Sequence, residues 1–384
     1  MSKVLLGDVA VEHKETCKGS KDGYPIVGLE HLVPEEITLT AWDEGSENTF
    51  TKTFRKGNVL FGRRRAYLKK AAVAPFDGIC SGDITVIEAK PDRILPELLP
   101  FIIQNDALFD FAVGKSAGSL SPRVKWEHLK NFEFELPDMD KQKELAALLW
   151  AMDDTKKSYQ KLIAATDELV KSQFMEQFGP AAATEKGWSQ FPVSKVICKP
   201  ISGEWGKDDP SGTGIKVLRT TNFTDAGYID YTDVVTRCIE QKKIEAKAMQ
   251  DGDILIEKSG GSDTKPVGRV VFYQDASENY LFNNFTALLR PIDSSINSRF
   301  LFMFLFVSYW NGATKLYENK TTGIHNLKLA DYLDNTMIPV PPIDIQDEFA
   351  AFIEQSDKSK FAALRSSNLN LSLCSESQRK IRML

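Results

Sequence analysis

The chain has 384 residues, of which 42% are hydrophobic and 26% are charged. This is the composition of a folded protein with roughly two or three domains, and it excludes a disordered or collagen-like chain. The formal net charge is −5, from 48 basic and 53 acidic side chains, so nucleic-acid binding would need a local concentration of positive charge. The most apolar run, residues 300–307, is too short to cross a membrane and predicts a buried helix.

Cysteine and histidine usage indicates neither a disulfide framework nor a metal centre. The 5 cysteines and 4 histidines are scattered along the chain without a CxxC pair. An odd number of cysteines and a start without a signal-peptide pattern predict a cytoplasmic protein. We therefore expect no metal site in this chain.

Residues 1–140 have the pattern of a mixed α/β domain. Short apolar runs such as Val59–Phe61 and Ile84–Ile87 predict strands, and the Gly and Asp residues between such runs predict turns. Pro137 ends the last extended segment, and Asp140 is suited to cap a following helix. The first domain is therefore expected to end where a long helix begins.

A basic segment lies inside this first domain. Residues 48–76 contain no acidic side chain, although the chain as a whole carries a net negative charge. Arginine can read the edge of guanine with two hydrogen bonds, and lysine mostly meets phosphate. The segment predicts a DNA contact, the alternative being a charged strand edge that blocks aggregation. The candidate residues are Arg63, Arg64, Arg65, Tyr67, Lys69 and Lys70.

A polar loop with a central glycine occurs once in each half of the chain. Lysine and hydroxyl side chains surround Gly118 in the first half and Gly323 in the second, which suits contacts to phosphates and base edges. The alternative is a structural turn that both halves keep. The candidates are Lys115, Ser116, Ser119, Ser121 and Arg123 in the first loop, and Lys320, Thr321, Thr322, His325 and Asn326 in the second.

Residues 141–178 predict one long helix. Its apolar positions recur in steps close to seven, which is typical of a narrow seam that pairs with another helix. About 38 residues would span roughly 57 Å. Gly179 and Pro180 end the helix, and residues 179–188 are expected to form a linker. The predicted pairing residues are Leu145, Leu148, Met152, Tyr159, Leu162 and Leu169, and the same apolar stripe continues with a small drift through Val170, Phe174 and Phe178.

Residues 189–343 predict a second mixed α/β domain, and residues 344–384 predict a second long helix. The two helices are expected to pair with each other, the alternative being that each packs on its own domain. The pairing residues expected on the second helix are Phe349, Phe352, Phe361 and Leu364. The polar candidates for DNA contact in the second domain are Arg219, Thr220, Thr221, Asn222, Lys258, Ser259 and Lys265.

The two halves of the chain repeat one another. Leu6–Val9 resembles Val193–Val196, and Leu136–Gln142, which ends the first domain, resembles Val340–Gln346. Such a repeat with shared order predicts a duplicated fold. We expect an α+β protein with two tandem, pseudo-repeated mixed α/β domains, separated by two long α-helices that form an antiparallel coiled-coil spacer.

Signatures of catalysis are missing from the sequence. It has no P-loop, GxSxG or HExxH motif, and no glycine-rich cofactor loop follows its first strand. We therefore expect a protein that is not an enzyme by itself. The alternatives are a standalone DNA-modifying enzyme and a repeat-built interaction scaffold without a DNA role.

Taken in order, the duplicated openings, the glycine loops and the proline-containing stops resemble the specificity subunit of type I restriction–modification systems. The helix end Glu168–Gly179 also looks very like the central spacer of that family. The resemblance implies that each domain is a target-recognition domain for one half of a bipartite, asymmetric DNA site. It also implies that the helices set the spacing and dock two copies of a DNA adenine methyltransferase subunit.

The same resemblance implies how the chemistry is divided among subunits. S-adenosylmethionine, ATP and Mg would be bound by partner subunits, and this chain would hold no cofactor. Its partners would be double-stranded DNA, the methyltransferase subunits and, further, an ATP-dependent restriction or translocase subunit. No membrane partner is implied.

Overall fold

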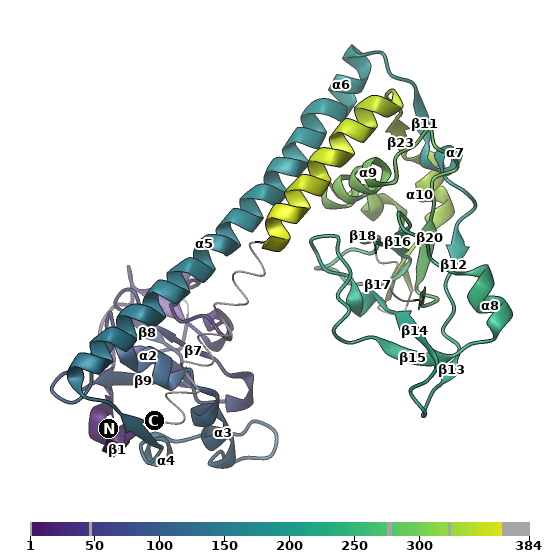
Figure 1. Ribbon diagram of the computed structural model, residues 1–384. Coiled ribbons are helices and arrows are strands. Elements are labelled where there is room, and N and C mark those ends of the chain that lie inside the picture. Colours follow the sequence, from purple (N-terminus) through teal and green to yellow (C-terminus); the bar gives the residue numbers. More distant parts are fainter. Residues whose placement is uncertain (1, 46–47, 275–278, 322–323, 363–384) are drawn as a thin grey trace. The chain divides into compact units, whose positions relative to one another are not determined.

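The computed structural model of the chain describes residues 2–45, 48–274, 279–321 and 324–362. It has two compact units, and the division between them falls between Gln160 and Lys161, inside the long helix α5 (Met139–Phe178) (Figure 1). Each unit contains its own clusters of buried hydrophobic side chains. The expectation of two tandem mixed α/β domains with a long helix between them is confirmed.

Unit 1 is built on two sheets with strand orders β2-β9-β6-β7 and β4-β3-β8-β5, and β1 pairs with β10. Its strands are β1 (Ser2–Leu5), β2 (Ala10–Glu12), β3 (Pro25–Val27), β4 (Asp43–Glu44), β5 (Lys52–Phe54), β6 (Val59–Gly62), β7 (Ala71–Val73), β8 (Gly78–Cys80), β9 (Ile84–Ala89) and β10 (Glu133–Leu136). Before α5 come the helices α1 (Leu6–Val9), α2 (Leu99–Ile103), α3 (Asp106–Gly114) and α4 (Trp126–Leu129), and the 3₁₀ turns η1 (Leu29–His31), η2 (Ala66–Leu68) and η3 (Pro96–Leu98).

Unit 2 has sheets with strand orders β12-β20-β16-β18, β13-β15-β14-β19 and β17-β22-β21, and β11 pairs with β23. Its strands are β11 (Gln190–Pro192), β12 (Ile201–Ser202), β13 (Lys207–Asp208), β14 (Ile215–Leu218), β15 (Val235–Cys238), β16 (Ile254–Glu257), β17 (Ser259–Gly261), β18 (Val270–Phe272), β19 (Tyr280–Phe282), β20 (Thr286–Leu289), β21 (Glu318–Thr321), β22 (Ile324–Leu327) and β23 (Met337–Pro339). Its helices and 3₁₀ turns are α6 (Pro180–Glu185), α7 (Val193–Val196), η4 (Thr220–Asn222), α8 (Gln241–Ala246), α9 (Ser298–Trp310), η5 (Ala313–Tyr317), α10 (Leu329–Asn335) and a helix over residues 343–362.

The repeat in the sequence is present in the topology. A central strand lies between two antiparallel neighbours in each unit, as β9-β6-β7 in unit 1 and as β20-β16-β18 in unit 2. Each unit also contains a parallel pair, β3 with β8 and β14 with β19. The sheet β17-β22-β21 of unit 2 has only isolated bridges as its counterpart among the described residues of unit 1.

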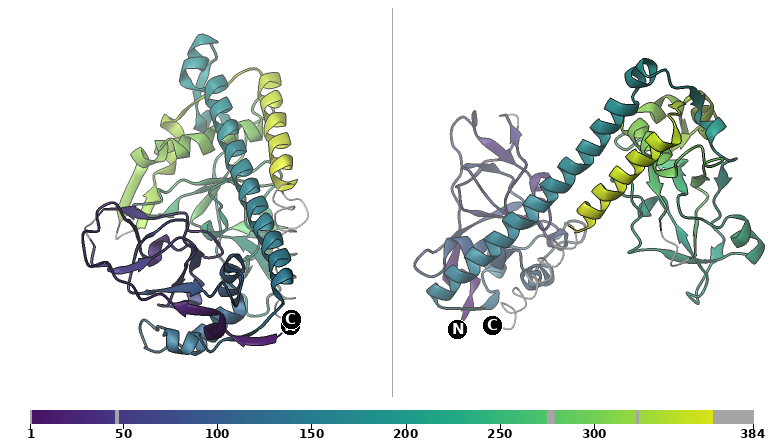
Figure 2. Two further views of the ribbon diagram at one scale, coloured as in Figure 1. Left: turned by 90° about the vertical axis from the view of Figure 1, so that its left-hand side faces the viewer. Right: turned by 45° about the horizontal axis from the view of Figure 1, so that its top comes forward.

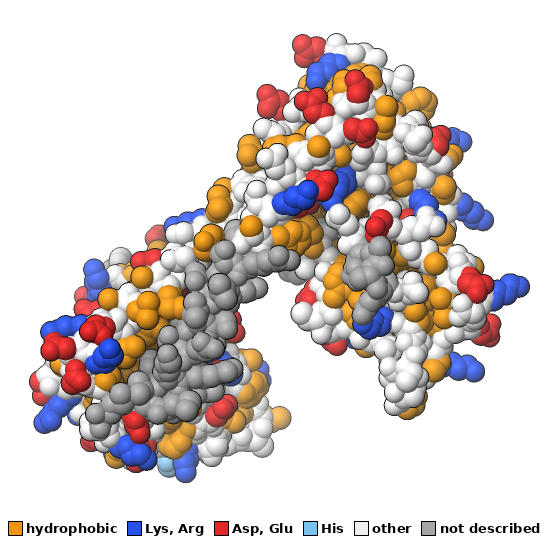
Figure 3. All heavy atoms as spheres, in the orientation of Figure 1, with side chains coloured by type: hydrophobic (Ala, Val, Ile, Leu, Met, Phe, Trp, Pro, Cys, Tyr) orange, Lys and Arg blue, Asp and Glu red, His pale blue; other side chains and the backbone are white. Residues whose placement is uncertain are grey.

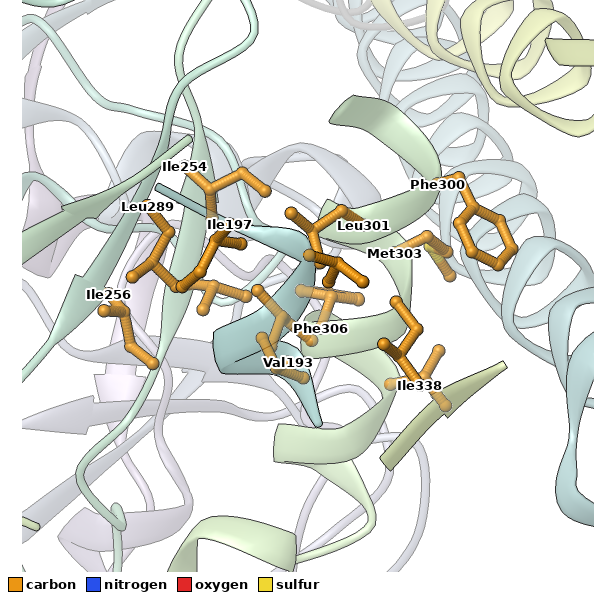
Figure 4. Close-up of a cluster of buried hydrophobic side chains, with 14 of the residues drawn as sticks. Val193, Ile197, Ile254, Ile256, Leu289, Phe300, Leu301, Met303, Phe306 and Ile338 are labelled. Carbon is orange, nitrogen blue, oxygen red and sulfur yellow. The ribbon is translucent and has the colours of Figure 1, made fainter. Parts of the chain in front are cut away.

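The central strands are buried because other elements cover both of their faces. Every residue of β6, β16 and β20 is buried. In unit 2 the apolar helix α9 packs against this sheet, and Figure 4 shows Leu301 and Phe306 of α9 facing Val193 and Ile197 from α7 and the residue after it. The apolar run at 300–307 is therefore a core helix, as the sequence predicted. Among the described residues, no helix is both long and apolar enough to cross a membrane.

The buried face of α5 differs from the predicted seam in unit 1 and follows the predicted apolar stripe in unit 2. In unit 1 the buried apolar positions are Ala146 and Leu149, which join the core of that unit. In unit 2 they are Val170, Phe174 and Phe178. In each unit, apolar residues of α5 therefore join the hydrophobic core of that unit.

The predicted pairing residues of α5 lie on a neighbouring face. Leu148, Leu162 and Leu169 have exposed fractions of 49%, 56% and 49%, so their pairing with a helix is not confirmed among the described residues. Leu145, Met152 and Tyr159 are half-buried. Adjacent helix positions differ by about 100°, so a heptad pattern shifted by one residue points to a different neighbour. Hydrophobic side chains are visible along this helix in Figure 3.

Helix 343–362 lies beside the C-terminal half of α5 and runs in the opposite direction, as the views in Figure 2 agree. The ring of Phe349 lies 5.5 Å from that of Phe174 and 5.1 Å from that of Phe178, whereas Lys360 Nζ reaches Asp167 Oδ1 at 2.7 Å. Phe349 is buried and Phe352 half-buried. The antiparallel arrangement is thus present in unit 2, but a coiled-coil pair is not confirmed. Phe361 is 48% exposed, and Leu364 lies outside the described residues.

A buried ionic cluster ties these two helices to unit 2. Lys360 is 9% exposed and contacts Asp167 and, at 2.9 Å, Asp357. Tyr228 donates a hydrogen bond to Asp357, and Arg299 of α9 contacts the same carboxylate at 3.3 Å. Burial alone would lower the pKa of Lys360, but the hydrogen bonds to Asp167, Tyr228 and Asp357 raise it. The lysine therefore remains charged and holds both helices.

A buried glutamine at the start of each long helix repeats the same contacts. Gln142 Oε1 accepts a hydrogen bond from the Leu95 N–H at 2.8 Å, and its Nε2 donates to the Pro137 carbonyl at 2.9 Å. Gln346 accepts from the Asn297 N–H at 2.9 Å and donates to the Pro341 carbonyl at 2.8 Å. These residues belong to the matching proline-containing stops. They anchor each helix on its own domain because a buried amide must satisfy its polar groups.

The segment 179–188, which the sequence predicted to be a linker, is partly helical. It contains α6, and Ala183 of this helix is buried. Pro180 is the first residue of α6, where its missing N–H costs no hydrogen bond. The Gly-Pro pair therefore ends α5 and also begins another helix.

Thiol reactivity is expected to follow burial. Cys80 is fully buried, and burial raises the pKa of its thiol to about 12, whereas Cys198 and Cys238 are exposed. At pH 8 the Cys80 thiol therefore stays protonated, whereas the thiolate is the reactive form. We expect a maleimide to label Cys198 and Cys238 in the native chain, and Cys80 only after unfolding, as measured by peptide mass spectrometry. Labelling of native Cys80 at the rate of Cys238 would contradict this burial.

Candidate nucleic-acid interface

In unit 1 the basic segment and the first glycine loop lie side by side. The Arg63 carbonyl accepts a hydrogen bond from the Val124 N–H at 3.0 Å, and the Arg65 N–H donates to the Pro122 carbonyl at 2.8 Å. Arg64 forms an antiparallel bridge with Arg123. The two segments lie far apart in the sequence, and backbone pairing joins them into one surface.

Three charged side chains meet on this surface. Arg123 donates to Asp83 from Nε at 2.7 Å and from Nη2 at 3.2 Å. Arg64 contacts the same carboxylate at 3.5 Å and donates to Ser121 Oγ at 3.0 Å. The hydrogen bond from Arg123 and the charges of both arginines lower the pKa of Asp83. The carboxylate therefore stays ionised and orients two guanidinium groups.

The other candidates of the basic segment lie on η2 and in the residues that follow it. Tyr67 is 55% exposed on η2, which lies between two residues with left-handed backbone, Arg65 and Lys69. Lys69 pairs with Asp106 at 2.7 Å, and Lys70 Nζ donates to the Leu29 carbonyl at 2.7 Å.

The first glycine loop begins at the end of α3. Lys115 Nζ lies 5.7 Å from the ring centroid of Phe111, and Ser116 Oγ donates to the Ala112 carbonyl at 2.8 Å. Ser119 is exposed. Gly118 has a φ of 112°, a conformation that favours glycine and lets the chain turn back toward Arg123. Ser116 therefore caps the helix, whereas Lys115 and Ser119 remain accessible.

In unit 2 the corresponding segments also meet, here as a regular sheet. Strand β17 pairs with β22, with Ser259 opposite Asn326, and β21 pairs with β22, with Lys320 opposite His325. The Lys258 carbonyl accepts from the Leu327 N–H at 2.8 Å, as the Arg63 carbonyl does from Val124. The same two chain segments therefore form one surface in both units.

Lys258 and Lys320 are the cations of this second surface. Lys258 Nζ donates to Ser202 Oγ at 2.8 Å, and burial followed by the nearby Lys247 lowers its pKa. Lys320 pairs with Asp263 at 2.5 Å, and this hydrogen bond lowers the pKa of that carboxyl. Thr321 belongs to β21, but its side chain lies outside the described residues, as does the whole of Thr322.

Two candidates of unit 2 are buried and must be reassigned. Asn222 is 3% exposed; its Oδ1 accepts from the Arg219 N–H, and its Nδ2 donates to two carbonyls. His325 is 5% exposed, with Nδ1 at 3.1 Å from Glu318. The predictions that Asn222 and His325 contact DNA are therefore wrong, because their polar atoms already hold turns and strands together.

The remaining candidates of unit 2 lie around η4. Arg219 Nη2 donates to Asp233 Oδ2 at 2.8 Å, and Lys265 pairs with Asp225 at 2.6 Å. Thr221 is exposed and Thr220 is half-buried. The Thr220 carbonyl accepts from Arg269, whose guanidinium also binds the buried carboxylate of Glu257. This buried ion pair fixes η4 beside β16, where the candidate surface begins.

Among the described residues, Glu30, His31 and Asp43 form one cluster of metal-binding residue types. His31 Nδ1 accepts a hydrogen bond from the Gly28 N–H at 2.9 Å, which places the proton of the neutral ring on Nε2. That nitrogen lies 3.5 Å from Asp43. The histidine thus holds a turn, as Asn222 does in unit 2, and its second nitrogen carries no lone pair for a metal.

Sequence reasoning missed two residues of these surfaces, Asp83 and Phe285. Asp83 contacts Arg64 and Arg123 in unit 1, and the Phe285 carbonyl accepts from the Lys258 and Ser259 N–H groups at 2.7 and 3.2 Å. Both residues directly precede a buried strand, β9 or β20. Comparison of the two repeats at the residue before this strand could therefore have indicated both positions.

The chain belongs to the family of type I restriction modification DNA specificity domains, whose family model matches it over residues 4–165 and 213–370. The specificity subunit of the type I restriction enzyme EcoDI from Escherichia coli is 23% identical over 202 residues. That match covers 53% of this chain and only 38% of the relative's own length.

Two solved structures share the fold. The S subunit of a type I restriction–modification system from M. genitalium has a TM-score of 0.58 at 12% identity, covering 99% of this chain and 95% of its own. A chain from the structures that explain complex assembly and conformational transition of the type I R-M system has a TM-score of 0.53 at 21% identity, covering 99% and 96%. At these identities the likeness concerns the fold alone.

Proposed function

We propose that this chain is the DNA sequence-recognition subunit of a type I restriction–modification complex. The observation that carries the proposal is the same surface, built twice: residues 63–65 beside 115–123 in unit 1, and residues 258–261 beside 318–321 and 324–327 in unit 2. Each surface presents Lys or Arg with hydroxyl groups, which suit phosphates and base edges. Each unit would read one half of a bipartite, asymmetric site in double-stranded DNA.

The long helices would set the distance between the half-sites and dock two copies of a DNA adenine methyltransferase subunit. A 40-residue α5 corresponds to roughly 60 Å of helix, enough to place two readers on successive major grooves, about 34–36 Å apart. The half-exposed Leu148, Leu162 and Leu169 offer apolar area for such docking. An ATP-dependent restriction or translocase subunit would be a further partner, and the complex would act in the cytoplasm.

Catalysis would belong to the partner subunits in this proposal. The ionisable groups that the two surfaces bring together, such as Asp83 with Arg64 and Arg123, form ion pairs that suit binding. S-adenosylmethionine, ATP and Mg would accordingly be bound by partners. The purified chain alone is expected to transfer no methyl group to DNA.

The test is co-expression of the chain with a methyltransferase subunit encoded beside it, followed by mapping of methylated adenines in the host DNA. We expect a split motif, with two short specific blocks around a fixed nonspecific gap. Exchange of residues 1–140 for those of a relative should change only one block. A complex that assembles but methylates nothing would contradict the proposed DNA-reading role, and methylation by the chain alone would favour a standalone enzyme.

A further inference from the structure

Asp83 and Phe285 occupy equivalent positions in the duplicated fold. The Arg63 N–H donates to the Asp83 carbonyl at 3.0 Å, and the Lys258 N–H donates to the Phe285 carbonyl at 2.7 Å. In both units the N–H group of the next residue closes a turn. The Ile84 N–H donates to the Ser81 carbonyl at 3.0 Å, and the Thr286 N–H donates to the Asn283 carbonyl at 3.1 Å. One backbone position of the candidate surface therefore carries a carboxylate in unit 1 and an aromatic ring in unit 2.

In unit 1 this position fixes the direction of two arginines. Asp83 takes the Nε–Nη2 edge of Arg123, so the Nη1 group on the other side of the planar fork points away from the carboxylate. The side chains of Arg123 and Arg64 remain 41% and 38% exposed, and Asp83 itself is 21% exposed. The Asp83 carboxylate thus orients both arginines, and their side chains remain exposed enough to contact a ligand.

In unit 2 the same position presents an apolar surface. Phe285 is 49% exposed although it lies beside the polar residues Lys258 and Ser259, and its neighbour Asn284 is exposed as well. The turn is held firmly, because the following Thr286 is fully buried and its Oγ1 donates to the Asn283 carbonyl at 2.8 Å. The ring therefore projects from a fixed backbone.

We propose that this position determines which base is read in each half-site. Asp83 would act as a positioning residue that aims Arg64 and Arg123 at guanine, whose O6 and N7 accept two hydrogen bonds from one arginine fork. Phe285 would touch a thymine methyl group, the apolar feature of the major groove. The inference rests on the proposed function, because it assumes that these surfaces contact DNA bases.

The experiment compares assembled, co-expressed methyltransferase complexes that differ only at these positions. The variants are Asp83→Ala, Asp83→Asn and Phe285→Ala. The matched controls are Glu133→Ala, which removes an exposed carboxylate paired with Lys3 in unit 1, and Ile292→Ala, which removes a 53% exposed apolar side chain in unit 2. The readouts are the methylated motif and the affinity for duplexes with single base changes in each block.

Asp83→Ala is expected to relax the specificity for guanine at one position of one block, with about a 10- to 100-fold loss of discrimination. The other block should stay unchanged. Asp83→Asn keeps the size and one acceptor oxygen, so it should give a smaller loss at the same base. Phe285→Ala should lower the discrimination for thymine at one position of the opposite block by about 10-fold. Both controls should keep the wild-type motif.

The inference would be overturned if the variants kept the wild-type motif, or if they weakened binding to all sequences alike, as the loss of phosphate contacts would. If Asp83→Ala fails to assemble, the isosteric Asp83→Asn decides: an unchanged motif refutes the positioning role. A wild-type complex that yields no split motif would instead refute the proposed function, so the two failures are distinguishable.

Discussion

Replacement of Arg63, Arg64 and Arg65 together by alanine is expected to weaken binding of the assembled complex to its DNA site by about 100-fold or more. Each lost bidentate contact to a base costs roughly 1–3 kcal/mol, and about 1.4 kcal/mol is a factor of ten. The loss should fall on one half-site, because all three arginines belong to unit 1. Fluorescence anisotropy with a labelled duplex, at several salt concentrations, measures both affinity and salt dependence.

The salt dependence separates lost phosphate contacts from lost base contacts in this triple variant. Arg65 is exposed, whereas Arg64 is held by Asp83 and Ser121. Loss of one phosphate contact should reduce the slope of log affinity against log salt by about 1, whereas loss of a base contact relaxes one position of the motif. The control is Arg93→Ala, an exposed arginine of unit 1 that pairs with Asp92. Unchanged affinity and unchanged motif in the triple variant would remove this segment from the interface.

Phe178→Ala is expected to destabilise unit 2 by about 3–5 kcal/mol. Phe178 is 2% exposed, and its ring lies 5.0 to 5.6 Å from those of Phe174, Trp188, Phe300 and Phe349. Truncation leaves a cavity where α5, α9 and helix 343–362 meet. Urea-dependent hydrogen exchange of peptides from α9 and β16, in the full chain, measures the free energy of opening of this unit.

Leu162→Ala on the same helix is the matched control. Leu162 is 56% exposed, and alanine is a good helix former, so the change in stability should stay within about 0.5 kcal/mol. The comparison also tests the predicted pairing seam. A loss at Leu162 as large as that at Phe178 would mean that another helix covers Leu162 in solution and that the original seam is correct.

Much of the architecture could be predicted from the sequence because it depends on local patterns. The matching proline-containing stops placed the starts of both long helices near Asp140 and Asp344, and the helices begin at residues 139 and 343. The buried glutamines Gln142 and Gln346, which belong to those stops, make the same hydrogen bonds in both units. A duplicated pattern and a helix stop are visible in a linear chain, since each involves neighbouring residues.

The faces of the long helices could not be predicted in the same way. Leu162 and Val170 both belong to an apolar pattern, yet the first is exposed and the second is 5% exposed. Periodicity shows that a helix has an apolar side, but the neighbour that covers each position comes from distant segments. In unit 2 these neighbours are α9 and helix 343–362, whose placement depends on Asp167, Asp357 and Lys360.

The candidate site likewise has features that the sequence predicted and features that it did not. Local residue patterns located segments of both surfaces. The acid-free run at 48–76 and the loops around Gly118 and Gly323 are visible in the linear chain. Burial could not be read from composition, so Asn222 and His325 looked like DNA-binding residues although their polar atoms are used within the fold. Their residue types suit base contacts and turn caps equally well.

The sequence by itself determined that this protein is a duplicated fold with two long helices and two polar surfaces. Those features follow from residue order, periodicity and charge. Only the tertiary structure decided that Asp83 holds Arg64 and Arg123, and that Phe285 takes the equivalent place in unit 2. The reason is physical: these contacts join residues from separate strands and loops, and their geometry exists only once the sheets have formed.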